Sequence, residues 1–249
     1  MVDKDYNYFI DAHNHYNETN INKIENSFKN NKLIAITCSV DFKSYEELLK
    51  IQSKNINNLF FAYGFYPEEV IKKSLNDCYK DLEKMDFTKA SAIGEIGLDY
   101  KITKDKIKRN EQIKLFEKQL EIAKDYNLPV EVHSRYATKP VLEILKSWTD
   151  LKIILHWFTG NENEIEQAFD LGFNITQRYG FPLIKNIKEH INQILIETDY
   201  PVPYNNTQKI EGIIESYNQF SKQYNITLDE TQKLIYNNFK KTFPKIKIR

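Results

Sequence analysis

The sequence predicts an α/β fold in which eight parallel strands alternate with helices and close into a (β/α)8 TIM barrel. Short runs rich in Ile, Val, Leu and Phe recur along the chain, separated by longer segments whose apolar residues return every three or four positions. The chain has 249 residues, close to the usual length of such a barrel. We therefore expect one domain over residues 1–249, with additional C-terminal helices.

Eight apolar runs are predicted as strands, and repeated βα units fit a closed barrel better than an open doubly wound sheet. In chain order they are Tyr8–His15, Leu33–Val40, Leu59–Phe65, Ser91–Ile96, Pro129–His133, Lys152–His156, Phe173–Gln177 and Gln193–Thr198. Helical segments lie between them. In Asn110–Tyr126, for example, Ile113, Phe116 and Leu120 fall on one face. After the last run, Thr207–Phe243 predicts two further helices.

The composition indicates a globular protein without a general attraction for polyanions. Hydrophobic residues make up 41% and charged residues 28%, which suits a packed core and excludes a disordered chain. Lys+Arg and Asp+Glu both number 35, so any site for a polyanion must be local.

Neither a membrane segment nor a cysteine-based site is expected. No uncharged apolar run reaches the roughly 18 residues of a membrane span, and the first residues lack the order of a secretion signal. We therefore expect no membrane association and a cytoplasmic location. Cys38 and Cys78 have no CxxC spacing, which predicts neither a disulfide framework nor a thiolate zinc site.

Four of the five histidines lie at the carboxyl ends of predicted strands: His13, His15, His133 and His156. In a barrel these ends face one mouth, where active sites are built. His13 and His15 are two residues apart on an extended chain, so their side chains point to the same side. Both imidazoles could therefore reach one metal ion.

Two acidic residues, Glu95 and Asp199, share this placement. A carboxylate that emerges from an apolar strand is costly to bury unless it is paired or bound to a cation. Taken singly, each of the six residues has an ordinary explanation: a turn cap, a lysine partner or a core hydrogen bond. Their convergence on one rim instead favours a divalent ion such as zinc or manganese, or magnesium if the carboxylates dominate. Six ligands exceed one tetrahedral site, which suggests two ions with Glu95 as the bridge.

These residues resemble the TatD family of metal-dependent hydrolases, within the amidohydrolase-like barrels. The similarity rests on five motifs in the family's order, carried by Asp11–His15, Gly94–Tyr100, Gln112–Arg135, Leu155–Gly160 and Glu197–Pro201. Together these motifs run through most of the chain. The resemblance implies a TatD-like barrel domain with hydrolytic activity.

The resemblance also implies the arrangement of the site. One ion is held by His13, His15 and Asp199, the other by His133 and His156, and Glu95 joins both. Family members are typically nucleases that cut phosphodiester bonds in DNA, often from the 3′ end. By analogy, Asp199 accepts a proton from the attacking water, and Arg135 adds a bidentate phosphate contact. The alternative for Arg135 is a structural ion pair at the rim.

Three positions depart from the family pattern. Asn17 and Tyr136 stand where acidic residues are usual, and Tyr66 replaces the histidine of a Gly-x-His-Pro motif. All six ligands remain, so the departures concern substrate contacts rather than the metal centre. Tyr66 could donate a hydrogen bond to a phosphate or stack on a base, or it could only pack at the rim.

The leading hypothesis is thus a metal-dependent deoxyribonuclease that uses two divalent ions (zinc, magnesium or manganese) and acts on DNA or another nucleic acid. The same chemistry would serve a two-metal hydrolase of a small amide, ester or lactone. A third hypothesis is a metal-binding barrel without turnover. No protein partner is inferred.

Overall fold

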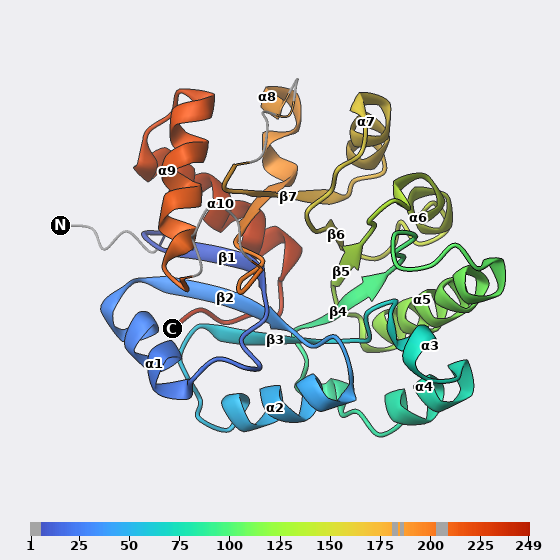
Figure 1. Ribbon diagram of the computed structural model, residues 1–249. Coiled ribbons are helices and arrows are strands. Elements are labelled where there is room, and N and C mark those ends of the chain that lie inside the picture. The colour runs from blue at the N-terminus through green and yellow to red at the C-terminus, as the bar shows by residue number, and fades with distance from the viewer. Residues whose placement is uncertain (1–5, 181–183, 185–186, 203–208) are drawn as a thin grey trace.

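The computed structural model describes residues 6–180, 184, 187–202 and 209–249 (Figure 1). Its centre is an eight-stranded parallel sheet whose strands pair in chain order, which confirms the predicted barrel fold. The strands are β1 (Phe9–Asn14), β2 (Leu33–Cys38), β3 (Leu59–Tyr63), β4 (Ala92–Gly97), β5 (Val130–His133), β6 (Ile153–Leu155), β7 (Asn174–Arg178) and β8 (Ile194–Glu197).

Helices surround this sheet (Figure 1). They are α1 (Ile21–Asn30), α2 (Phe42–Gln52), α3 (Glu69–Lys72), α4 (Leu75–Leu82), α5 (Lys106–Tyr126), α6 (Thr138–Leu145), α7 (Glu162–Asp170), α8 (Ile187–His190), α9 (Gly212–Tyr224) and α10 (Leu228–Thr242), with short 3₁₀ turns η1 (Phe87–Lys89) and η2 (Ile191–Gln193). Within the described residues, no helix is long and apolar enough to cross a membrane.

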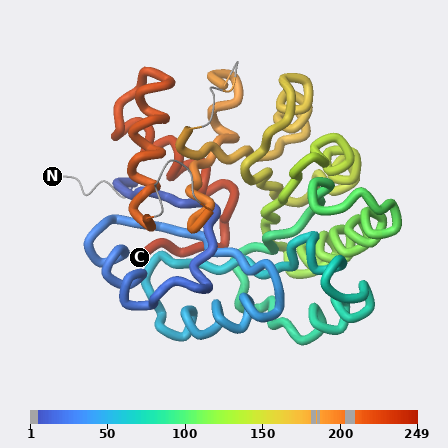
Figure 2. The backbone as a smooth tube through the Cα atoms, viewed as in Figure 1, coloured from blue at the N-terminus to red at the C-terminus, as the bar shows by residue number. Residues whose placement is uncertain are grey.

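Hydrogen bonds at the carboxyl ends of β1 and β8 join the first strand to the last. The path of the backbone at this junction can be followed in Figure 2. The Asp199 amide donates to the His13 carbonyl at 3.0 Å, and the His15 amide donates to the Tyr200 carbonyl at 2.6 Å. The amide of Thr198 also donates to the Asp11 carboxylate at 2.9 Å. We call this junction the seam. Its bonds place the end of β1 directly beside the segment that follows β8.

Each predicted strand is found, with ends that differ from the prediction by at most two residues. The differences matter most at the mouth, where β1 ends before His15 and β6 ends before His156. The chain turns just after β6 and β8, where Trp157 and Asp199 have positive φ, 40° and 53°. Several chemistry-bearing side chains therefore lie just beyond the strands rather than on them.

Capping explains the helix boundaries. Helix α5 begins four residues before the predicted Asn110, because the Asp105 side chain accepts hydrogen bonds from the amides of Ile107 and Lys108. It ends at Tyr126 as predicted, since Asn127 adopts the left-handed conformation with φ of 49°.

The two predicted C-terminal helices are present as α9 and α10, although the predicted start at Thr207 lies outside the described residues. Helix α10 begins with a capping box made by Thr227 and Glu230. Helix α9 packs beside β1, where the Ile10 amide donates to the Tyr217 hydroxyl at 2.9 Å. These helices therefore cover the outside of the seam.

Aliphatic side chains fill most of the core, but the carboxyl ends of the strands also bury ionisable groups. Eight such residues are at most 4% exposed: Asp11, His13, Glu95, Asp99, Glu131, His156, Glu197 and Asp199. Burying isolated charges is costly, so these groups must satisfy one another or a bound ion.

One glycine at this mouth has no room for a side chain. Gly97 ends β4 with φ of 134°, and an added Cβ would lie 2.1 Å from the His133 carbonyl oxygen. We expect Gly97→Ala to lower the free energy of unfolding by about 3 kcal/mol or more, because both the strained φ and the overlap must be relieved. Urea unfolding followed by circular dichroism measures this.

Gly172 provides the matched control. It also has positive φ, 79°, but an added Cβ would meet no described atom within 4 Å. Gly172→Ala should therefore cost only about 1 kcal/mol, from the backbone conformation alone. If both variants lose the same free energy of unfolding, the close contact between position 97 and the His133 carbonyl oxygen does not explain the effect.

Candidate metal centre

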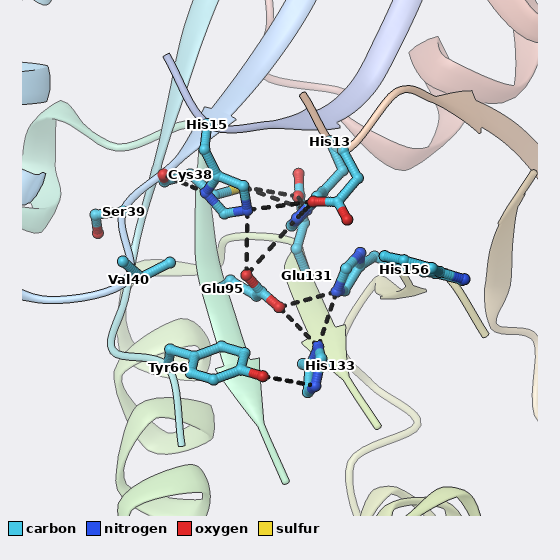
Figure 3. A network of polar contacts seen from close by, with 12 residues as sticks. His13, His15, Cys38, Ser39, Val40, Tyr66, Glu95, Glu131, His133 and His156 are labelled. Atoms are coloured by element: carbon cyan, nitrogen blue, oxygen red, sulfur yellow. Dashed lines mark hydrogen bonds and ion pairs between the residues drawn. The ribbon is translucent and has the colours of Figure 1, made fainter. Parts of the chain in front are cut away.

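The six predicted ligand side chains come together at the mouth of the barrel. Figure 3 shows Glu95 between the four histidines. Its Oε2 lies 3.3 Å from Nε2 of His15. Its Oε1 lies 2.8 Å from Nδ1 of His133 and 2.9 Å from Nε2 of His156. The two oxygens of one carboxylate thus face two different groups of histidines, which is the geometry that a bridging ligand requires.

The first group combines His13 and His15 from the end of β1 with Asp199 from the segment after β8. Oδ1 of Asp199 lies 3.5 Å from Nε2 of His15 and 3.9 Å from Nε2 of His13. The latter nitrogen is buried and has no hydrogen-bond partner among the described residues. A buried lone pair that faces two carboxylates fits a divalent cation, so these residues suit a metal site.

The second group combines Glu95 with His133 from β5 and His156, which follows β6. Nδ1 of His133 lies 3.1 Å from Nε2 of His156, and Oε1 of Glu95 is within 3 Å of both nitrogens. Two imidazole nitrogens and a carboxylate oxygen at this spacing again form a set of donors typical of zinc or manganese.

Each histidine also has a neighbour at its other ring nitrogen. These neighbours are the Cys38 carbonyl for His15 (3.0 Å), Glu131 for His13 (2.6 Å), the Tyr66 hydroxyl for His133 (3.0 Å) and Glu197 for His156 (3.7 Å). Hydrogen bonds of this kind fix the tautomer and orientation of metal-binding histidines, and the first three contacts are within hydrogen-bond distance. Glu197 lies beyond that distance from His156. Sequence reasoning overlooked Glu131 and Glu197, although each is an acidic residue within an apolar strand, the same signal that identified Glu95.

The charges in the cluster depend on one another. Burial alone would raise the pKa of Glu95, but His156, His133 and His15 outweigh it and hold this pKa well below its usual range. Burial would likewise lower the pKa of His15, yet hydrogen bonds to Asp199 and Glu95 raise it to about 10. Burial and the nearby His156 lower the pKa of His13. Glu95 is therefore ionised, and His13 is neutral, at neutral pH.

A pocket of about 530 Å³ opens above the cluster. His15, Glu95, His133, His156 and Asp199 line it, together with a rim that includes Tyr66, Lys72, Arg135, Tyr136 and Trp157. This volume lies in the range of small-molecule and cofactor sites. The ionisable cluster is therefore accessible from solvent on one side.

A network ties the two predicted substrate contacts to the rim. The Tyr66 hydroxyl donates to Oδ2 of Asp99 at 2.5 Å, and the same oxygen accepts from Arg135 Nη2 at 2.5 Å and from Nε at 2.8 Å. Arg135 thus forms an ion pair with Asp99 at the rim, the structural role given above as the alternative to a phosphate contact. Its side chain is 44% exposed. Burial, Glu95 and Asp99 raise the pKa of Tyr66 far above its usual value, so the phenol remains a hydrogen-bond donor.

Two other polar residues considered from the sequence, Asn17 and His190, lie outside this cluster. Asn17 donates to Glu47 at 3.2 Å. The fifth histidine, His190, lies 3.1 Å from Glu166 and stacks on Phe169 with ring centroids 4.4 Å apart. The structure therefore does not bring His190 to the candidate metal centre.

A barrel that gathers histidines and carboxylates at its mouth, beneath an open pocket, has the architecture of the metal-dependent hydrolases. The profile described as TatD related DNase matches residues 10–244. The chain belongs to this TatD family of metal-dependent hydrolases, as its motifs predict.

Individual relatives agree with this assignment. The chain is 31% identical over 221 residues to an uncharacterized metal-dependent hydrolase of Buchnera aphidicola, covering 78% of this chain and 81% of that protein. It is 32% identical over 170 residues to the human 3′-5′ RNA nuclease TATDN2, covering 63% of this chain and 21% of that protein. The crystal structure of YjjV, a TatD homologue from Escherichia coli, matches the fold with a TM-score of 0.80 at 23% identity, over 95% and 98% of the chains.

Proposed function

We propose that this hydrolase is a nuclease that cleaves phosphodiester bonds in DNA or another nucleic acid with two divalent ions at its mouth. The observation that carries the proposal is the position of Glu95, whose two carboxylate oxygens face separate groups of histidines beneath the pocket. The family description and the human RNA nuclease support a nucleic acid as the substrate.

The proposed ligand assignment follows the two groups. His13, His15 and Asp199 would hold one ion, His133 and His156 the other, and Glu95 both. Bound ions would polarise the attacking water and offset charge on the phosphoryl oxygens.

Asp199 is the proposed proton acceptor. It lines the pocket, with Oδ1 3.5 Å from Nε2 of His15 and Oδ2 3.4 Å from Nη1 of the buried Arg178. The guanidinium of Arg178 helps to orient this carboxylate beside His15, and a well-oriented carboxylate can serve as a general base.

The rim offers contacts for a phosphate and for bases. Arg135 and Lys72 supply positive charge beside the pocket, although the whole chain has a net charge of zero. Tyr66 presents a protonated phenol, and its hydroxyl could donate to a phosphate oxygen in place of Asp99 when substrate binds. Tyr136 is 76% exposed, and an exposed aromatic ring at a pocket rim is suited to stacking on an unpaired base.

Release of nucleotides from single-stranded DNA by purified protein tests the proposal. The assay adds magnesium, manganese or zinc, includes a chelator control, and compares wild type with Glu95→Ala. An RNA of the same sequence runs in parallel. Metal-dependent release that disappears in the variant supports a nuclease. No release from either nucleic acid, despite bound metal, would contradict it.

Acidic side chains at the rim favour one alternative, a hydrolase of a small uncharged amide, ester or lactone. Glu68 and Glu69 line the pocket beside Lys72 and would disfavour a polyanion. Variants of Arg135 separate the two functions, because only a phosphate substrate needs its charge.

We expect Arg135→Gln to lower kcat/KM for DNA by about 10- to 100-fold, mainly through KM, since a hydrogen bond to a charged group contributes about 1.5–3 kcal/mol. Hydrolysis of a neutral aryl ester, where detectable, should change by less than about threefold. Equal losses on both substrates would instead indicate that Arg135 maintains the rim through Asp99.

A further inference from the structure

Glu131 is a fully buried carboxylate that the proposed reaction does not use. It lies on β5, two residues before His133, with 0% exposure. Its Oε2 lies 2.6 Å from Nδ1 of His13 and accepts a hydrogen bond from the Cys38 thiol at 2.9 Å (Figure 3). These partners belong to β1 and β2, so one carboxylate oxygen joins three strands inside the barrel.

The contacts of Glu131 determine what the other side of the His13 ring can do. A neutral imidazole carries one proton, and a carboxylate that accepts from Nδ1 holds the proton there. Nε2 then keeps its lone pair. This nitrogen is buried without a hydrogen-bond partner among the described residues, 3.8 Å from Oε2 of Glu95 and 3.9 Å from Oδ1 of Asp199. The lone pair therefore faces the two carboxylates of the candidate metal centre.

We propose that Glu131 is a positioning residue that fixes the tautomer and orientation of His13, and that the Cys38 thiol holds the Glu131 carboxylate in place. The inference rests on the proposed metal centre. Carboxylates behind metal-binding histidines typically change metal affinity by about 10- to 100-fold when removed. Glu131 thus acts on the ion through His13 without touching substrate.

A competing explanation is that Cys38, Glu131 and His13 themselves bind an ion, because their donor atoms lie within 4.8 Å of one another. The 2.6 Å separation of Nδ1 and Oε2 argues against it, since this is a direct hydrogen bond. Two ligands each about 2.0–2.2 Å from a tetrahedral ion would lie farther apart.

The test compares Mn²⁺ binding by the apoproteins of wild type, Glu131→Gln and Glu131→Met, measured by isothermal titration calorimetry. Gln retains an oxygen that accepts from Nδ1, whereas Met has similar volume and no strong acceptor. We expect Glu131→Gln to bind Mn²⁺ within about threefold of wild type and Glu131→Met to bind one ion about 10- to 100-fold more weakly.

A purely structural role would give the opposite pattern. It predicts that Glu131→Met lowers the free energy of unfolding of the apoprotein in urea and leaves Mn²⁺ affinity unchanged. Glu166→Met is the matched control, because Glu166 also contacts a histidine, His190, at 3.1 Å, but away from the candidate centre. Its Mn²⁺ affinity should equal that of wild type.

The outcomes separate the inference from the function on which it rests. If wild type binds no Mn²⁺, Zn²⁺ or Mg²⁺, the metal centre itself is wrong. If wild type binds two ions and Glu131→Met binds them equally well, the centre stands and the positioning role is wrong. A thiolate charge-transfer band in the Co²⁺ spectrum, absent from Cys38→Ser, would also overturn the inference in favour of Cys38 as a ligand.

A measurement on wild type keeps the inference testable if Glu131→Met does not fold. Nitrogen chemical shifts of the His13 ring in the apoprotein report which nitrogen carries the proton. We expect a protonated Nδ1 and a bare Nε2. Protonation at Nε2 would contradict the proposal.

Discussion

Replacing Glu95 by alanine is expected to reduce metal-dependent hydrolysis by about 10³-fold or more and to lower the number of tightly bound ions. The two oxygens of Glu95 approach His15 on one side and His133 and His156 on the other, so its loss removes a donor from both groups. A metal ion contributes several kcal/mol to the stabilisation of charge in such reactions, and about 4 kcal/mol corresponds to 10³-fold in rate.

Metal analysis after dialysis, combined with the DNA assay, measures both effects. Glu121→Ala serves as the control, because Glu121 is an exposed residue of α5 that pairs with Lys118. It should retain wild-type metal content and activity. A Glu95→Ala protein that keeps two ions and near-normal turnover would exclude Glu95 as the bridge.

Asp199→Asn is expected to reduce kcat by between about 10² and 10⁴, the usual contribution of a general base. Asparagine keeps the shape of the side chain, so the barrel should remain folded. The variant loses the negative charge that faces His15 and Arg178. It can therefore neither accept a proton efficiently nor balance the charge of Arg178.

Steady-state kinetics, far-UV circular dichroism and Mn²⁺ titration separate the possible causes. A folded variant that binds Mn²⁺ but turns over slowly supports the role of Asp199 in proton transfer. Asp150→Asn, at an exposed residue paired with Lys124, should behave as wild type. Near-normal kcat in Asp199→Asn would exclude Asp199 as the proton acceptor.

The fold and the six-residue cluster could be predicted because both depend on strand ends. In a parallel barrel, residues that follow different strands meet at one mouth, so a histidine after a strand is informative without any knowledge of register. His13, His133 and His156 were placed together in this way. The assignment to the TatD family required, in addition, five motifs in the correct order.

The outer contacts could not be predicted because they depend on the relative heights of residues in separate strands. Glu131 meets His13 across 118 positions of sequence, and Arg135 meets Asp99 across 36. Such pairs follow from strand register and side-chain direction, which composition and periodicity do not determine. The helix start at Lys106 was missed for a more local reason, since the Asp105 cap precedes the apolar stripe.

The seam between β1 and β8 also has a consequence for how the chain is made. Its bond between Thr198 and Asp11 spans 187 positions, so the first strand emerges from the ribosome long before its last partner exists. Until β8 follows, one side of β1 is an unpaired edge, and exposed strand edges promote aggregation. Translation that stops before Ile194 would leave β1 unpaired on that side and separate His13 and His15 from Asp199. Truncated chains should therefore depend on chaperones to stay in solution.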